Sequence, residues 1–96
     1  MSKKVIIESK VKSDSIDTLM SFLAENLPNV RGFSGCQQVI VYLDPENRTM
    51  IFDEEWLSIE HHRKYINAIS ENGVLKELAT FLEAPPEIKY FDQVEL

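Results

Sequence analysis

The sequence feature that most constrains the fold is a pair of strand-like segments in the middle of the chain, joined by a short turn. Cys36 to Leu43 (CQQVIVYL) and Thr49 to Trp56 (TMIFDEEW) are rich in the β-branched and aromatic residues that favour strands. The residues between them, Asp44-Pro45-Glu46-Asn47, have the composition of a turn. Together these segments predict an antiparallel β-hairpin.

A strand and a helix are expected before the hairpin. Val5 to Lys12 predicts a strand with one apolar face, made by Val5, Ile7 and Val11. Residues 16–27 carry apolar side chains at helical spacing. Ser13-Asp14-Ser15 supplies candidates for the helix N-cap, and Pro28 is expected to end this helix.

Two helices and a last strand are expected after the hairpin. Ser58 is a good cap for a second helix that runs to about Glu71, where Asn72-Gly73 is a stop signal. Val74 to Leu82 predicts a short third helix, and Ile88 to Val94 predicts the last strand.

The resulting order of elements is βαββαβ, with one extra helix before the last strand. That order predicts an α+β fold of ferredoxin-like type, a four-stranded antiparallel sheet with helices on one face. The chain has 96 residues, no visible repeat and no linker, so we interpret residues 1–96 as a single domain.

The strands also predict a homodimer. A half-exposed antiparallel strand should alternate apolar and polar residues, yet Val39 to Leu43 is apolar on both faces, and Val5 to Ile7 and Met50 to Phe52 repeat this pattern. Helices cover only one face of such a sheet. A second copy of the chain, packed sheet to sheet, is the simplest cover for the other face.

Charge and cysteine content narrow the class of protein. The formal net charge of −6 disfavours a nucleic-acid partner, because an acidic surface repels phosphates. The single cysteine, Cys36, cannot form an internal disulfide and fits a reducing compartment. No apolar run is long enough to span a membrane, and the N-terminus has no secretory pattern, so we expect a cytoplasmic protein.

Motifs around the hairpin resemble those of the antibiotic biosynthesis monooxygenase family. They are Gly35-Cys36 before a hydrophobic strand, Asp44-Pro45, Phe52-x-x-Glu55-Trp56-x-Ser58 before a helix, and Pro85-Pro86-x-Ile88-x-Tyr90-Phe91-Asp92. The resemblance implies a dimeric α+β barrel with a pocket between sheet and helices in each subunit. It also implies oxygenase activity on polyphenolic or quinol-like substrates without metal or flavin, although the family has haem-degrading and isomerase relatives.

The second predicted helix carries the first candidate for chemistry. Many members of the family have a histidine nine residues after the tryptophan, where this chain has Tyr65. At 100° per residue, His62 falls within the apolar stripe of Ile59, Ile66 and Ile69, and His61 falls outside it. His62 is therefore either an acid/base in a dry pocket or a core histidine bonded to a backbone carbonyl or to Tyr65. His61 is expected to face solvent.

Aromatic and aliphatic residues complete the candidate site. Trp56 can form a pocket wall and donate its indole N–H to a substrate oxygen, or it can simply pack in the core. Tyr65 can donate a hydrogen bond to a ligand or pack at a subunit interface. Phe52, Leu78 and Phe81 are candidate pocket walls, with core packing as the alternative.

No metal, haem or flavin site is expected, and no nucleophile. Asp53 and Glu55 should share one strand face and Glu54 the other, so these carboxylates do not converge, and we interpret them as a solvated acidic patch. Cys36 has no basic partner nearby in the sequence and is interpreted as a small buried apolar residue.

These observations lead to one functional hypothesis with two alternatives. The leading one is a cofactor-independent monooxygenase that oxidises a small quinol-like or polyphenolic aromatic, with His62, Trp56 and Tyr65 in the site. The alternatives are an isomerase that moves a proton on an enolisable molecule, and a non-catalytic dimer that binds a small ligand.

Overall fold

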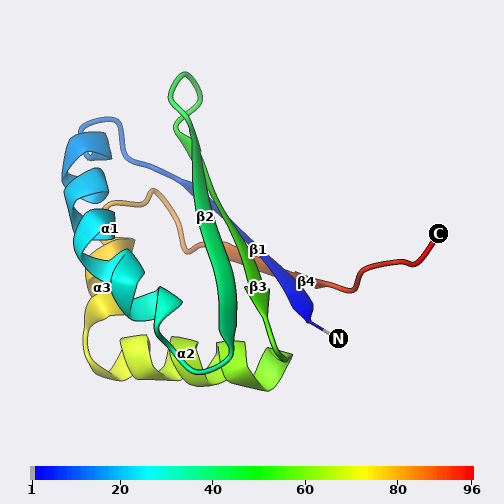
Figure 1. Cartoon of the computed structure of the whole chain (residues 1–96). Helices are drawn as coiled ribbons and strands as arrows, with labels where there is room; N and C mark the ends of the chain where they lie inside the picture. The colour runs from blue at the N-terminus through cyan, green and yellow to red at the C-terminus, as the bar shows by residue number, and fades with distance from the viewer. Residues whose placement is uncertain (1) are drawn as a thin grey trace.

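The computed structural model describes residues 2–96 and confirms the ferredoxin-like α+β fold (Figure 1). Its sheet is antiparallel with strand order β2-β3-β1-β4, and the helices cover one face. The elements are β1 (Lys3–Lys10), α1 (Ile16–Arg31), β2 (Cys36–Asp44), β3 (Thr49–Trp56), α2 (Ile59–Glu71), α3 (Val74–Ala79) and β4 (Glu87–Phe91).

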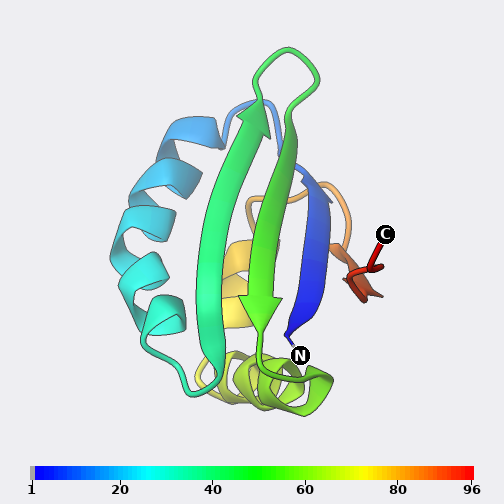
Figure 2. The same ribbon diagram turned by 45° about the vertical axis from the view of Figure 1, so that its right-hand side comes forward.

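The hairpin of β2 and β3 follows the predicted bounds almost to the residue. On β3 each inward side chain is buried and each outward one is partly exposed, so the period-2 pattern of the strand is fully realised. The inward residues of β3 are Met50, Phe52, Glu54 and Trp56. The turn between the strands projects beyond the rest of the molecule (Figure 2).

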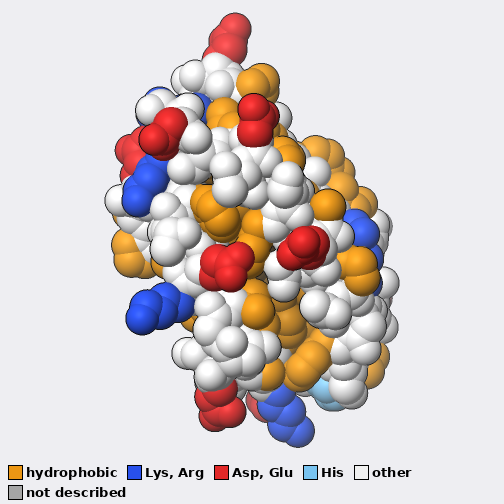
Figure 3. Space-filling model, turned by 90° about the vertical axis from the view of Figure 1, so that its left-hand side faces the viewer, with side chains coloured by type: hydrophobic (Ala, Val, Ile, Leu, Met, Phe, Trp, Pro, Cys, Tyr) orange, Lys and Arg blue, Asp and Glu red, His pale blue; other side chains and the backbone are white. Residues whose placement is uncertain are grey.

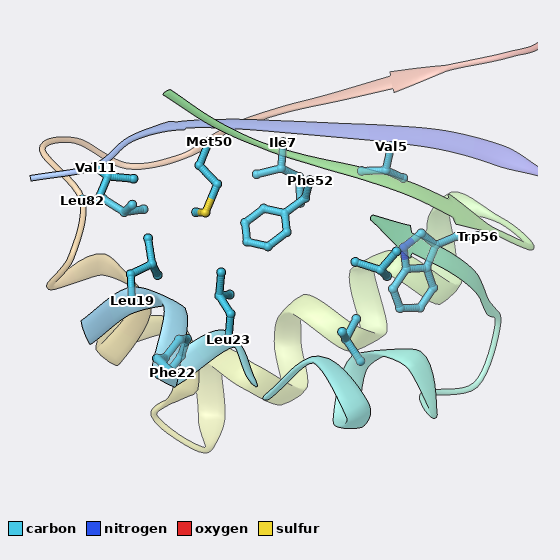
Figure 4. Packing of buried hydrophobic residues seen from close by; sticks show 12 residues of the cluster. Val5, Ile7, Val11, Leu19, Phe22, Leu23, Met50, Phe52, Trp56 and Leu82 are labelled. Carbon is cyan, nitrogen blue, oxygen red and sulfur yellow. The ribbon is translucent and has the colours of Figure 1, made fainter. Parts of the chain in front are cut away.

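The hydrophobic core lies between the sheet and α1. Side chains of β1 and β3 point toward Leu19, Phe22 and Leu23 of α1 (Figure 4). Val5, Leu19 and Trp56 are completely buried. Each large apolar side chain buried in this way stabilises the fold by roughly 1.5–3 kcal/mol.

The helix α1 differs from the prediction because it continues through Pro28 to Arg31. A proline inside a helix loses one backbone hydrogen bond and normally ends the helix. Here the last turn is held by contacts that lie outside the helix. Val30 is buried in the core, and the Arg31 guanidinium donates to the carbonyl oxygen of Val39 on β2 at 2.9 Å.

The segment before β4 also differs from the prediction. The helix α3 ends at Ala79 instead of Leu82, because Leu82 forms a β-bridge with Val11. Backbone bonds from Lys12 N to Phe81 O (2.9 Å) and from Glu83 N to Lys10 O (2.9 Å) fasten this segment to the end of β1. Pairing of distant backbone groups therefore decides where α3 ends.

The helix α2 lies across the end of the sheet where β3 ends (Figures 1 and 2). As predicted, Ser58 caps the helix, because its hydroxyl oxygen accepts the backbone N–H of His61 at 3.2 Å. The helix stops before Gly73, whose φ of +88° suits glycine. This placement brings the inner face of α2 against the C-terminal end of β3.

The face of the sheet opposite the helices is mixed in character. Ile6, Ile40 and Ile51 lie on it, half-buried by their neighbours. Lys4 crosses this face and donates to Asp53 at 2.7 Å. The outer face therefore carries apolar side chains from three strands, with charged groups between them.

Candidate functional site

The inner face of α2 meets two successive inward residues of β3, Glu54 and Trp56. The Trp56 ring lies with its centroid 5.3 Å from that of His62 and 5.4 Å from that of Tyr65. The three residues that the sequence nominated for chemistry therefore lie together at the end of the sheet. Phe33, in the loop before β2, joins this aromatic cluster, with its ring centroid 5.3 Å from that of Tyr65.

Glu54 is the residue that sequence reasoning missed. Its carboxylate is buried, with only 4% of the residue exposed, and its Oε1 accepts the indole N–H of Trp56 at 2.8 Å. The prediction of a solvated acidic patch is wrong for Glu54, although Asp53 and Glu55 do lie on the outer face beside Lys4. The usable signal was the strand period, which places Glu54 on the same face as Phe52 and Trp56.

Burial raises the pKa of the Glu54 carboxyl to about 7. The low-dielectric surroundings disfavour its charged form, and the nearby charge of Asp53 adds to this effect. The hydrogen bond from Trp56 acts in the opposite direction but does not cancel the desolvation. Glu54 is therefore poised to gain and lose a proton near neutral pH.

His62 is completely buried beside Glu54. Its Nδ1 lies 2.8 Å from the hydroxyl oxygen of Tyr90, and its Nε2 lies 3.7 Å from Glu54 Oε1. Burial lowers the pKa of His62 to about 4. At pH 7 the imidazole is therefore neutral, and the two residues do not form an ion pair. The partner of His62 is Tyr90, not the Tyr65 or backbone carbonyl considered from the sequence.

A cavity of about 70 Å³ lies between the sheet and the three helices. Most of its wall is apolar, with side chains such as Ile7, Leu23 and Ile69. Three residues with polar side chains also line it, and they are Asn26, Glu54 and Tyr65. A small apolar cavity with a few convergent polar groups is the usual form of a ligand site.

A wider groove of about 670 Å³ adjoins this cavity. Five residues line both hollows: Ile66, Leu75, Leu78, Pro86 and Ile88. Figure 3 shows the helix side of the molecule, where hydrophobic side chains are exposed between scattered charges. Since an apolar cavity of about 150 Å³ holds benzene, an aromatic ring would enter this smaller cavity only if part of the shared wall moved.

The candidate residues divide between the cavity wall and the layer behind it. Phe52, Tyr65 and Leu78 line the cavity, whereas Trp56 and His62 lie behind Glu54 and do not. Phe81 lines neither hollow, because its ring packs on Phe22 with centroids 5.4 Å apart. Phe81 therefore packs against the core, which was the alternative to a place in the pocket wall.

Burial also fixes the protonation of two other groups. The pKa of the Tyr65 hydroxyl is raised to about 12 by burial and by the nearby Glu54 and Cys36, so Tyr65 stays a hydrogen-bond donor. Burial raises the pKa of the Cys36 thiol too, and Glu54 adds to this effect. Cys36 is therefore a thiol and not an activated nucleophile.

His61 is half-buried, although the sequence predicted a solvated side chain. Its Nδ1 lies 2.7 Å from the Ser58 hydroxyl oxygen. Its ring also packs on the backbone of Gly35, where a Cβ atom would lie 2.5 Å from the imidazole. The glycine before β2 thus leaves the space that His61 occupies, away from the cavity.

Family comparison supports the sequence motifs. The sequence profile of the antibiotic biosynthesis monooxygenase family matches residues 4–68. The chain belongs to this family. A search of curated proteins finds no significant match.

Solved structures show the same fold as this member of the antibiotic biosynthesis monooxygenase family. A conserved protein from Methanosarcina mazei Go1 is similar with a TM-score of 0.86 at 18% identity, over 98% of this chain and 94% of that one. Rv0793 from Mycobacterium tuberculosis has a TM-score of 0.83 at 14% identity, over 100% and 98%. A further structure, described as an antibiotic biosynthesis monooxygenase, has a TM-score of 0.85 at 17% identity, over 97% and 99%.

Residues 2–96 contain neither a cluster of metal ligands nor a helix that could span a membrane. Within the described residues, no group of three His, Cys, Asp or Glu side chains converges as metal ligands would. In the same residues, no helix has both the length and the apolar character needed to cross a membrane.

Proposed function

We propose that this protein is a cofactor-independent monooxygenase that oxidises a small quinol-like or polyphenolic aromatic with dioxygen. The observation that carries the proposal is the buried carboxyl group of Glu54, with a pKa of about 7, in the wall of a mostly apolar cavity. Membership of the antibiotic biosynthesis monooxygenase family supports the reaction class.

Removal of a phenolic proton is the first task of such an enzyme. A phenol has a pKa of about 10, whereas an ordinary glutamate has a pKa of about 4.3, so an ordinary glutamate is a poor base for it. The pKa of about 7 at Glu54 brings base and phenol closer together. We assign the proton-accepting role to Glu54 instead of His62, because the pKa of His62 is about 4 and its ring does not reach the cavity.

The deprotonated aromatic then supplies the electrons. It passes one electron to dioxygen, and the two radicals combine in the dry cavity, where water cannot interfere. Overall the substrate loses two hydrogens and gains one oxygen atom, and the second oxygen atom leaves as water. The protein's part is to remove the proton, hold the anion and exclude solvent.

The remaining residues bind and orient the substrate. Tyr65, whose hydroxyl stays protonated, donates a hydrogen bond to a substrate oxygen. Phe52 and Leu78 form apolar walls for the ring. Trp56 holds the Glu54 carboxylate through its indole N–H. Leu78 is one of the residues that line both the cavity and the groove, so its movement would help to admit the ring.

The test is oxygen uptake by the purified protein with a panel of quinols and polyphenols. Glu54→Gln should lower the rate on an active substrate by about 10²–10⁴-fold, which is the usual contribution of a general base. The matched control is Glu55→Gln on the outer face of the same strand, which should leave the rate unchanged. Full activity of Glu54→Gln, or no oxygen uptake with any substrate, would refute the proposal.

The small volume of the cavity favours a second candidate, an isomerase acting on a small enolisable molecule. Glu54 would move the proton, and Tyr65 would donate to the enolate oxygen. Incorporation of deuterium from solvent without oxygen uptake would identify this activity. Binding without either reaction would identify a non-catalytic ligand-binding protein.

We also propose that the protein works as a cytoplasmic homodimer. The outer face of the sheet carries Ile6, Ile40 and Ile51, and Tyr42 on the same face is 54% exposed. A second copy of this chain would cover these side chains. The single cysteine, present as a thiol, fits a reducing compartment.

A further inference from the structure

We propose that Tyr90 and His62 are positioning residues for Glu54: the Tyr90 hydroxyl holds His62 in the tautomer that directs its Nε2–H at the Glu54 carboxylate. The catalytic meaning of this arrangement rests on the proposed function, but the arrangement itself can be tested without turnover. It links three elements of the fold, because Tyr90 lies on β4, His62 on α2 and Glu54 on β3.

The geometry of His62 carries the proposal. Tyr90 is paired with Val5 in the β1–β4 ladder and so faces the interior, where its hydroxyl oxygen lies 2.8 Å from His62 Nδ1. The other ring nitrogen, Nε2, is buried and has no hydrogen-bond partner within residues 2–96. The atom it faces is Oε1 of Glu54, at 3.7 Å. The imidazole therefore bridges a tyrosine hydroxyl and a buried carboxylate.

One tautomer fits this arrangement when Glu54 is ionised. With its proton on Nδ1, the imidazole would direct the lone pair of Nε2 at the Glu54 carboxylate, which repels it. With the proton on Nε2, the positive end of the N–H dipole faces the carboxylate, and Nδ1 accepts the hydroxyl proton of Tyr90. The ionised Glu54 carboxylate favours this second tautomer, and the Tyr90 hydroxyl stabilises it by donating to the free lone pair of Nδ1.

Arg31 on α1 is a positive charge that acts on Cys36, but within residues 2–96 no positive charge measurably shifts the pKa of Glu54. Cys36 on β2 and Tyr65 on α2 both have a raised pKa and are neutral. Asp53, on the outer face of β3, adds a negative charge that disfavours ionisation of Glu54. Favourable interactions with the Glu54 anion therefore come from two N–H groups, the indole of Trp56 at 2.8 Å and the imidazole of His62 at 3.7 Å.

The single tryptophan of the chain provides a direct readout. Because the Trp56 indole donates to Glu54, its fluorescence should change as Glu54 titrates, with a midpoint near pH 7 in the wild type. Glu54→Gln should abolish this transition. Tyr90→Phe should move the midpoint up by roughly half to one pH unit, because the anion loses an oriented dipole. Tyr42→Phe is the matched control and should leave the midpoint unchanged, because Tyr42 lies on the outer face of the sheet, opposite the face that carries Glu54.

Nitrogen NMR of His62 gives a second measurement. In the wild type at pH 8 the protein should show the proton on Nε2, and in Tyr90→Phe a substantial fraction should carry it on Nδ1. A midpoint that does not move in Tyr90→Phe, or a wild-type His62 protonated on Nδ1, would overturn the proposal. Both readouts need only folded protein, so an absence of oxygen uptake would refute the proposed function and leave this inference standing.

Discussion

At the scale of single residues, Glu54 and His62 give the protein opposing pH dependences of stability. The pKa of Glu54 is raised from 4.5 to about 7 in the folded protein, which therefore binds this proton more tightly than the unfolded chain does. The free energy of unfolding that this group contributes is lost as pH rises through this range. The pKa of His62 is lowered from 6.5 to about 4 in the folded protein, which therefore binds this proton more weakly than the unfolded chain does. The free energy of unfolding that this group contributes is lost as pH falls through that range. Where the two ranges overlap, the effects largely cancel.

Glu54→Gln should separate the two effects. Glutamine keeps an oxygen for the Trp56 indole but cannot ionise, so the cost of a buried charge disappears at high pH. Relative to the wild type, we expect the variant's free energy of unfolding to rise by about 2–3 kcal/mol between pH 5 and pH 8. Urea unfolding at both pH values measures this difference. If variant and wild type differ by the same free energy of unfolding at both pH values, Glu54 does not titrate in this range. Glu55→Gln is the control, and its difference from the wild type should be the same at pH 5 and pH 8.

At the scale of elements, the short helix α3 forms part of the wall that the cavity shares with the adjoining groove. Leu78 on α3 lines both the cavity and the adjoining groove, so its side chain is part of the wall between them. The helix has six residues and follows Gly73, whose φ is +88°. A helix this short has little stability of its own and depends on packing. It is therefore the element whose movement would most readily open the cavity.

Leu78→Ala should join the two hollows. We expect a bulky aromatic probe such as naphthol to bind more tightly, while the free energy of unfolding falls by about 1–3 kcal/mol because a half-buried leucine is shortened. Calorimetric titration and urea unfolding measure the two effects. Leu57→Ala is the control, because Leu57 is 51% exposed and lines neither hollow. Equal probe affinities in the wild type and Leu78→Ala would contradict this role of Leu78.

At the scale of the whole molecule, the proposed homodimer has the outer face of the sheet as its interface. Light scattering after gel filtration should give twice the chain mass of 11.1 kDa. Ile40→Lys should yield a monomer, because it places an unpaired charge within the apolar part of that face. Met20→Lys on α1 is the control and should remain dimeric, since Met20 lies on the helix side. A monomeric wild-type protein at micromolar concentration would refute the dimer.

Local sequence patterns determined the elements and the direction of most side chains. The period of β3 placed Phe52 and Trp56 inward, and the period of α2 placed His62 inward, because each pattern depends only on backbone geometry within one element. The hydroxyl of Ser58 fixed the start of α2 for the same local reason. These positions could be predicted without knowledge of the fold.

Contacts between distant segments were decided only by the tertiary structure. Glu54 became the buried carboxyl group of the site because α2 and the core cover the inner face of β3, which removes water from it. His62 acquired Tyr90 as its partner because β4 pairs with β1, and Phe81 turned to Phe22. The helix α1 kept Pro28 because Val30 and Arg31 beyond it contact the core and β2. A single sequence does not encode such long-range pairings in its local period, because they depend on how separate elements pack.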